Sequence, residues 1–162
     1  MPYPSGDMKI EPLTRLPHPA WLRLRTALWP GCSEAEHLSE MQTFLHEPER
    51  YAQFIAVSDA DLPLGFTEAS LRTDHVNGTA SSPVAFLEGL YVEPGARRRG
   101  VARALVRAVI SWAMERSCIE LASDTQLENT WSQAVHARLG FEETERVVYF
   151  RMALGSGNAA RP

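Results

Sequence analysis

The stretch Arg97-Arg98-Arg99-Gly100-Val101-Ala102-Arg103 decides the fold, because four arginines meet where a predicted strand gives way to a predicted helix. The unpaired N–H groups and the macrodipole make a helix N-terminus electropositive, so acidic residues are the usual choice there. Arginines at this position indicate that an anion occupies the site. A strand, a basic turn containing glycine and a helix N-terminus together predict a phosphate cradle. The alternative is that these arginines only solvate a surface turn or contact nucleic acid.

The residues before and after the arginines predict the strand and the helix that flank this cradle. Leu87 to Val92 reads as a strand, and Pro94-Gly95 turns the chain. Apolar residues then recur at the spacing of one helix face, at Val101, Leu105, Val109 and Trp112. We therefore predict a long helix from the cradle to about Arg116.

Length and composition predict one globular domain. The chain has 162 residues, of which 44% are hydrophobic and 22% charged, and its net charge is −4. We expect a domain over residues 8–154, with flexible ends at 1–7 and 155–162. A net acidic chain with one concentrated basic spot is not typical of nucleic-acid binders, and it suits a cationic partner.

The two cysteines and the first residues indicate the compartment. Cys32 and Cys118 are too few for a disulfide framework or a metal site, so we expect free thiols and no metal. Residues 1–7 lack the charged and apolar regions of a secretory signal, and no apolar run approaches membrane-spanning length. We therefore expect a cytoplasmic protein without membrane partners.

The rest of the chain predicts an α/β fold with a mixed sheet. Ser33 and Glu36 form a capping box that opens a helix. In the helix expected from Asn129 to Leu139, Trp131 should point inward, and Gly140 should end it. The remaining elements expected are a helix at 19–29, a short buried strand at 119–122 and further strands at 8–11, 52–57, 64–72, 142–145 and 147–154.

Two motifs resemble the GNAT superfamily of N-acetyltransferases. Its acetyl-CoA signature, Arg/Gln-x-x-Gly-x-Gly/Ala, is met by residues 97–102. A second pattern, an Asn twelve residues before the Phe of a Gly-Phe pair, is met by Asn129 and Phe141. The resemblance implies acetyl-CoA as co-substrate. It also implies a mostly antiparallel sheet whose central parallel strands splay apart, flanked by about four helices.

Further blocks resemble the aminoglycoside 6′-N-acetyltransferases, which acetylate one amine of these antibiotics. They include Leu28-Trp29-Pro30 and the segments 74–78 and 140–147. This resemblance implies a cationic aminoglycoside substrate, antibiotic resistance and a homodimer. The chain departs from the family at two places: His75 stands where many members have Tyr, and His136 stands where the superfamily often has a Tyr general acid.

The resemblance also implies the site residues. The cofactor positions are Leu90, Tyr91, Val92, Arg97, Arg98, Arg99, Gly100, Val101, Ala102, Arg103 and Asn129. The substrate positions are Trp29, His75, Glu88, Asp124 and Glu145. Several have a plainer alternative: Leu90 and Val92 could pack in the core, as could Trp29, and Glu145 could be a solvated charge.

Two carboxylates are the candidates for acid–base chemistry. An aminoglycoside amine is mostly protonated at neutral pH, so its attack on a thioester needs a proton acceptor. Glu88 and Asp124 lie on the two strands expected to splay around the cofactor, and Asp124 is the better candidate. Alternatively, Glu88 pairs with a nearby Arg and Asp124 only ends its strand. The competing functions are acetylation of another amine, such as a polyamine or a protein N-terminus, and non-catalytic acyl-CoA sensing.

Overall fold

The computed structural model describes residues 7–155, so the expectations for residues 1–6 and 156–162 lie outside it. The strands and helices follow one another as β1 (Met8–Pro12), α1 (Pro19–Leu28), α2 (Glu34–His46), β2 (Tyr51–Ser58), β3 (Pro63–Arg72), β4 (Val84–Val92), a 3₁₀ turn η1 (Pro94–Ala96), α3 (Val101–Glu115), β5 (Leu121–Ser123) and α4 (Thr130–Leu139). The elements expected up to residue 139 are all present, with small shifts at their ends.

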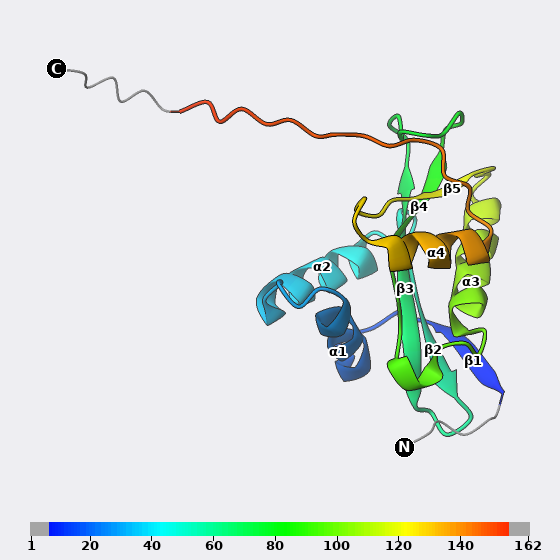
Figure 1. Ribbon diagram of the computed structural model, residues 1–162. Coiled ribbons are helices and arrows are strands. Elements are labelled where there is room, and N and C mark those ends of the chain that lie inside the picture. The colour runs from blue at the N-terminus through cyan, green and yellow to red at the C-terminus, as the bar shows by residue number, and fades with distance from the viewer. Residues whose placement is uncertain (1–6, 156–162) are drawn as a thin grey trace.

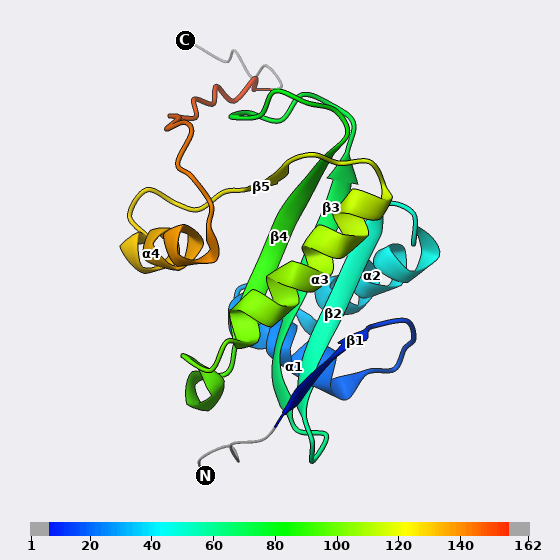
Figure 2. The same cartoon turned by 90° about the vertical axis from the view of Figure 1, so that its right-hand side faces the viewer.

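One mixed sheet of five strands in the order β1-β2-β3-β4-β5 forms the centre of the domain. The first three pairings are antiparallel, and β4 pairs with β5 in parallel. Helices α1 and α2 lie on one face of the sheet and α3 covers the other (Figures 1 and 2). The predicted mixed, mostly antiparallel sheet with four α-helices is therefore confirmed.

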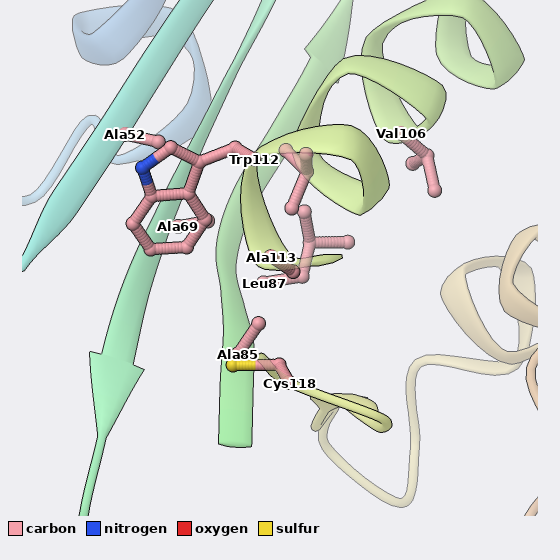
Figure 3. Close-up of a cluster of buried hydrophobic side chains, with 9 residues drawn as sticks. Ala52, Ala69, Ala85, Leu87, Val106, Trp112, Ala113 and Cys118 are labelled. Carbon is pink, nitrogen blue, oxygen red and sulfur yellow. The ribbon is translucent and has the colours of Figure 1, made fainter. Parts of the chain in front are cut away.

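Helix α3 is anchored by the apolar stripe that the sequence predicted. Val101, Leu105, Val109 and Trp112 are all buried. Trp112 packs with small residues of three strands, including Ala52 and Ala69, as Figure 3 shows. A fully buried side chain of this size stabilises the fold by roughly 1.5–3 kcal/mol, so this stripe fixes where α3 begins.

The capping box that opens α2 is present. Glu36 N–H donates to the Ser33 hydroxyl at 3.2 Å, and Ser33 N–H donates to the Glu36 carboxylate at 2.7 Å. The backbone N–H of Ser33 is the main reason that the pKa of Glu36 is lowered. The short motif Ser-Glu-Ala-Glu therefore predicted this helix start correctly.

The strands expected at 142–145 and 147–154 are absent, and that prediction was wrong. Residues 141–155 adopt no regular structure and leave the sheet (Figure 1). Phe150 is 94% exposed. The segment has the β-branched and aromatic residues of a strand, but a strand also needs a neighbour to share its hydrogen bonds, and residues 141–155 pair with none of the strands β1 to β5.

Two smaller expectations around β5 and α4 were also wrong. The strand expected at 119–122 lies at Leu121–Ser123 and is only half-buried, and Ile119 is 85% exposed. Trp131 points outward, being 61% exposed, and α4 has no fully buried residue. Residues 141–155 leave the sheet, so no further strand of the described residues covers its edge at β5. Apolar residues there, such as Ile119, therefore remain in contact with solvent.

Candidate active site at the fork between β4 and β5

Strands β4 and β5 separate in the middle of β4. Their pairing runs from Ala85–Leu121 to Leu87–Ser123 and then stops. Strand β4 continues to Val92, and no strand within residues 7–155 pairs with that outer edge. Glu88 and Asp124 each lie one residue beyond the last pair. The expected splayed strands are present, and they bring the positions of both candidate carboxylates to the apex of one fork.

Glu88 is set apart from its neighbours by a β-bulge. The register with β3 passes from Glu68–Gly89 to Ala69–Leu87, so Glu88 is the extra residue on β4. Bulges re-aim a side chain and are frequent beside active sites. The Glu88 carboxylate accepts hydrogen bonds from the Ser70 hydroxyl and from the Arg72 guanidinium, the latter at 2.8 Å. The alternative that Glu88 pairs with a nearby arginine is therefore confirmed.

Glu88 and His75 line one hollow of about 750 Å³, which opens beside the ends of β2 and β3. Asp74, from the segment 74–78, also lines it. Sequence reasoning did not single out several of its other residues: Glu49, Arg50, Tyr51, Ser70 and Arg72. Ser70 is itself buried and Arg72 is half-buried at the end of β3, so no alternation of buried and exposed residues marks either of them. Glu49 could not have been found from the sequence, because an acidic residue in a turn that contains proline is usually just solvated.

Trp29 lies against the bulge. A Cβ added to Gly89 would meet the Trp29 ring at 2.5 Å, so only glycine fits there. The ring is also fixed from behind, because the buried guanidinium of Arg25 lies 4.8 Å from its centroid. Trp29 is thus half-buried beside Glu88, and it contributes both to packing and to the wall of the fork.

Arg25 belongs to a buried charged network below Trp29. Glu68 accepts hydrogen bonds from the Arg25 guanidinium and, at 2.8 Å, from the Trp21 indole. Burial raises the pKa of Glu68, and the Arg25 charge acts in the opposite direction. Such a pair adds little net stability, but losing one partner leaves a buried charge uncompensated. The network therefore fixes the position of Trp29 more than it stabilises the fold.

The turn before α3 has the features of an anion cradle. Arg98 (φ 62°) and Gly100 (φ 80°) both adopt left-handed backbone conformations, which help to turn successive N–H groups toward one point. Among the α-helices of residues 7–155, α3 alone has no side-chain cap, and its first turn has no acidic residue. Its first N–H groups are therefore left for an outside acceptor, which fits the phosphates of a CoA molecule.

Arg97 connects the end of β4 with α4. Its Nε donates to the Val92 carbonyl at 3.1 Å, and its guanidinium lies 5.0 Å from the centroid of the Trp131 ring. Asn129 caps α4 by accepting from Ser132 N–H at 3.0 Å, so only its side-chain NH₂ remains free to donate. These contacts place the start of α4 across the fork from the cradle.

His136 ties β5 to α4. Its Nε2 lies 2.9 Å from the Ser123 hydroxyl, and its Nδ1 lies 2.8 Å from the Ser132 carbonyl oxygen. Because a carbonyl can only accept, Nδ1 carries a hydrogen. The Ser123 hydroxyl also lies 3.3 Å from the Leu87 carbonyl on β4. His136 therefore reaches the apex of the fork only through Ser123.

The remaining predicted residues are exposed. Asp124 makes no hydrogen bond or ion pair with another residue of the described chain. Glu145 lies in the irregular segment 141–155, next to Thr144, which packs against Gly78 in the loop after β3. Within residues 7–155, no group of His, Cys, Asp and Glu side chains could hold a metal ion, and no helix is long and apolar enough to cross a membrane.

Comparisons with known proteins agree with this geometry. The family model described as Acetyltransferase (GNAT) family matches residues 19–141. An aminoglycoside N(6′)-acetyltransferase type 1 of Acinetobacter genomosp. 13 is 49% identical over 148 residues, covering 91% of this chain and 100% of that one. One of Serratia marcescens is 52% identical over 136 residues, covering 84% and 92%.

A solved structure extends the likeness to three dimensions. It is that of AAC(6′)-Iy in complex with the bisubstrate analogue CoA-S-monomethyl-acetylneamine. The two chains superpose with a TM-score of 0.86 at 46% identity, covering 91% of this chain and 99% of that chain. By its sequence and its fold, this chain belongs to the GNAT acetyltransferase family.

Proposed function

We propose that the protein transfers the acetyl group of acetyl-CoA to the 6′-amine of an aminoglycoside antibiotic, and so confers resistance. The observation that carries this proposal is the fork: two carboxylate positions meet at its apex, beside an uncapped, arginine-rich helix start. Relatives near 50% identity over most of the chain are named for this reaction. A polycationic substrate also suits a net charge of −4.

Acetyl-CoA is assigned to the fork and the cradle. The N–H groups from Arg98 to Arg103 would hold its pyrophosphate, with the arginine side chains adding charge-assisted bonds. The pantetheine arm resembles an extended peptide, and the free edge of β4 at Leu90, Tyr91 and Val92 offers it backbone hydrogen bonds. The Asn129 NH₂ would donate from the opposite side.

The aminoglycoside is assigned to the hollow beside Glu88. Its ammonium groups would meet the carboxylates of Glu88 and Asp124, with Glu49 and Asp74 along the same wall. Trp29 and His75 offer flat faces to the sugar rings, and Glu145 approaches from the segment after α4. Several carboxylates around one hollow favour a substrate with several positive charges.

The chemical step is direct attack by the amine. Asp124 takes the proton of the 6′-ammonium group, directly or through water. The neutral nitrogen attacks the thioester carbonyl carbon, while N–H groups of β4 stabilise the negative charge that develops on the oxygen. The C–N bond forms, the C–S bond breaks, and the departing thiolate takes a proton from solvent. No covalent enzyme intermediate is needed: Cys118 is buried, which raises the pKa of its thiol, and Cys32 lies in the exposed turn before α2, in no motif that would activate it.

The exposed apolar residues of 147–154 support a homodimer. Tyr149, Phe150, Met152 and Leu154 are each more than 80% exposed. Contiguous apolar surface of this kind marks an interaction site, and a strand-like segment without a neighbour pairs readily with a second copy. The test is sedimentation equilibrium: the protein should be a dimer, and the Phe150→Asp variant should shift toward monomer. A monomeric unaltered protein would refute this assembly.

Two alternatives remain for the reaction: acetylation of a polyamine or protein N-terminus, and acyl-CoA sensing without catalysis. A thiol-release assay with acetyl-CoA against aminoglycosides, polyamines and peptides separates them. We expect turnover with aminoglycosides. Turnover with peptides alone would refute the assignment. A complete lack of turnover with all three classes of amine would favour a sensor. We also place the protein in the cytoplasm, a reducing compartment that suits its two free cysteines.

A further inference from the structure

The short connection between α3 and β5, residues 116–120, contacts two loops whose residues line the hollow beside Glu88. One is the turn 47–50 between α2 and β2, and the other is the loop 73–83 between β3 and β4. Figure 2 shows the connection running from the end of α3 toward β5, below the green loop that joins β3 to β4. Two of its charged side chains, Arg116 and Glu120, each bind one of these loops, although neither side chain lines the hollow itself.

Arg116 holds the turn between α2 and β2. Its Nε donates to the Glu49 carbonyl at 3.2 Å, and its Nη2 donates to the Pro48 carbonyl at 3.4 Å. Its Nη1 donates to the Trp112 carbonyl at 3.3 Å, and the guanidinium lies 4.7 Å from the centroid of the Trp112 ring. A planar guanidinium offers several donors in a fixed arrangement, which a lysine ammonium group does not. Arg116 therefore joins this turn to the buried stripe of α3.

The contact fixes the turn through its backbone and leaves the Glu49 side chain open to the hollow. That side chain is 94% exposed, so packing does not hold it. Its carboxylate lies 3.6 Å from Arg116 Nη2, and such an exposed ion pair contributes little. On the other side of the turn, Leu71 N–H donates to the Arg50 carbonyl at 2.7 Å and joins the turn to β3. Arg116 and β3 together therefore determine where Glu49 lies in the wall of the hollow.

Glu120 holds the loop between β3 and β4. Its carboxylate accepts hydrogen bonds from the Ser81 hydroxyl and, at 3.0 Å, from Ala80 N–H. These two donors lower the pKa of Glu120, the Ser81 hydroxyl more than the Ala80 N–H. The backbone carbonyl of Glu120 accepts from Ala85 N–H on β4 at 3.2 Å, so Glu120 is itself fixed to the sheet. The loop that it holds brings His75 to the hollow.

We propose that Arg116 and Glu120 are positioning residues for the aminoglycoside, which hold the Glu49 turn and the His75 loop where one substrate molecule can meet both. The inference rests on the proposed function. Without these contacts the two loops would have to be ordered when the substrate binds, and that ordering reduces affinity. Because neither side chain touches the substrate, their loss should raise the aminoglycoside KM while kcat and the acetyl-CoA dissociation constant stay nearly unchanged.

A double-mutant cycle on the aminoglycoside KM, at saturating acetyl-CoA, tests the role of Arg116. Arg116→Met keeps an apolar side chain on Trp112 but loses the donors, and it should raise KM about fivefold. In a Glu49→Ala background the same change should have little further effect, because the group that Arg116 positions is gone. Arg116→Lys keeps the charge without the fork of donors, so KM should still rise at least about twofold. The control is Arg15→Met, an exposed arginine outside the hollow, which should leave KM unchanged.

The matching cycle for Glu120 uses His75. Glu120→Ala should raise the aminoglycoside KM about threefold, and this rise should disappear in a His75→Ala background. The expected effect is smaller than that of Arg116→Met because Val76, next to His75, is buried and also holds the loop.

The possible failures can be told apart. An unchanged KM in the Arg116 variants or in Glu120→Ala would overturn the inference, and so would a rise that is equally large with and without the positioned residue. A merely structural role would lower the melting temperature and leave KM as it is. If Arg116→Met does not fold, Arg116→Lys and Glu120→Ala decide the outcome. A lack of aminoglycoside turnover in the unaltered protein would instead contradict the proposed function, and this inference with it.

Discussion

The guanidinium of Arg72 lies 2.8 Å from Glu88 Oε1, so the carboxylate that the bulge on β4 presents already has a cationic partner. The same guanidinium lies 3.5 Å from the centroid of the Phe86 ring. The Glu88 side chain is one third exposed, so solvent weakens this pair. An aminoglycoside ammonium group can therefore share Glu88 with Arg72 or displace it.

Glu88 and Arg72 should have opposite effects on substrate binding. We predict that Glu88→Gln raises the aminoglycoside KM about tenfold, because one cation-binding charge is lost. Arg72→Gln should lower KM by up to about fivefold, because exposed ion pairs contribute at most about 1 kcal/mol. Steady-state kinetics at saturating acetyl-CoA measures both. An unchanged KM in Glu88→Gln would remove Glu88 from the substrate site.

Asp124 should matter for the chemical step. We predict that Asp124→Asn lowers kcat/KM for the aminoglycoside about 10²-fold or more, which is within the range of positioned acid–base groups. The acetyl-CoA dissociation constant and the melting temperature should hardly change, since Asp124 is exposed and has no partner in the described chain. A lower melting temperature with intact kinetics would reduce Asp124 to a strand-end residue and leave Glu88 as the acceptor.

His136 should be a structural residue. Both of its ring nitrogens are bonded, to Ser123 and to Ser132, and so we predict that His136→Phe lowers kcat by less than about tenfold. The melting temperature should fall, because each lost hydrogen bond costs about 1 kcal/mol. Ser123→Ala is the matched variant, since it breaks the same contact from the other side. A thousandfold loss of kcat with acetyl-CoA binding intact would make His136 the general acid.

Gly100 tests the phosphate cradle. The Gly100→Asp variant would place a carboxylate where phosphate is expected, and Gly100→Asn has nearly the same shape without the charge. Both carry similar strain at φ 80°, which Asn and Asp tolerate better than most residues. Calorimetry should show acetyl-CoA affinity falling at least about tenfold more in the Asp variant than in the Asn variant. Equal affinities in the two would place the phosphates elsewhere.

The sequence predicted the parts of the fold that depend on local signals. The apolar spacing in α3, the capping box at Ser33 and the left-handed Gly140 each depend on residues within a few positions of one another. The fork was expected only through the family resemblance. Its position at Leu87–Ser123 depends on how far two distant strands pair, and no short stretch of sequence determines that.

The failures concern residues whose environment lies outside the local sequence. Residues 147–154 have the composition of a strand, but they pair with no strand of the described residues 7–155. Trp131 was expected inside because its spacing puts it on one helix face with Val135 and Leu139, yet its partner is the Arg97 guanidinium at the surface. Arg72 was missed because an arginine at the end of a strand is usually solvated, and only the bulge at Glu88 brings the two side chains together.

The most direct measurement of the central claim is the site of acetylation on a matched pair of aminoglycosides, one with a 6′-amine and one with a 6′-hydroxyl in its place. With acetyl-CoA and the purified protein, the account predicts one acetyl group per molecule of the 6′-amine compound, located at that nitrogen by mass spectrometry and NMR. It predicts no product from the 6′-hydroxyl compound. Acetylation of both compounds at another amine, or of neither while a polyamine or peptide is acetylated, would contradict it.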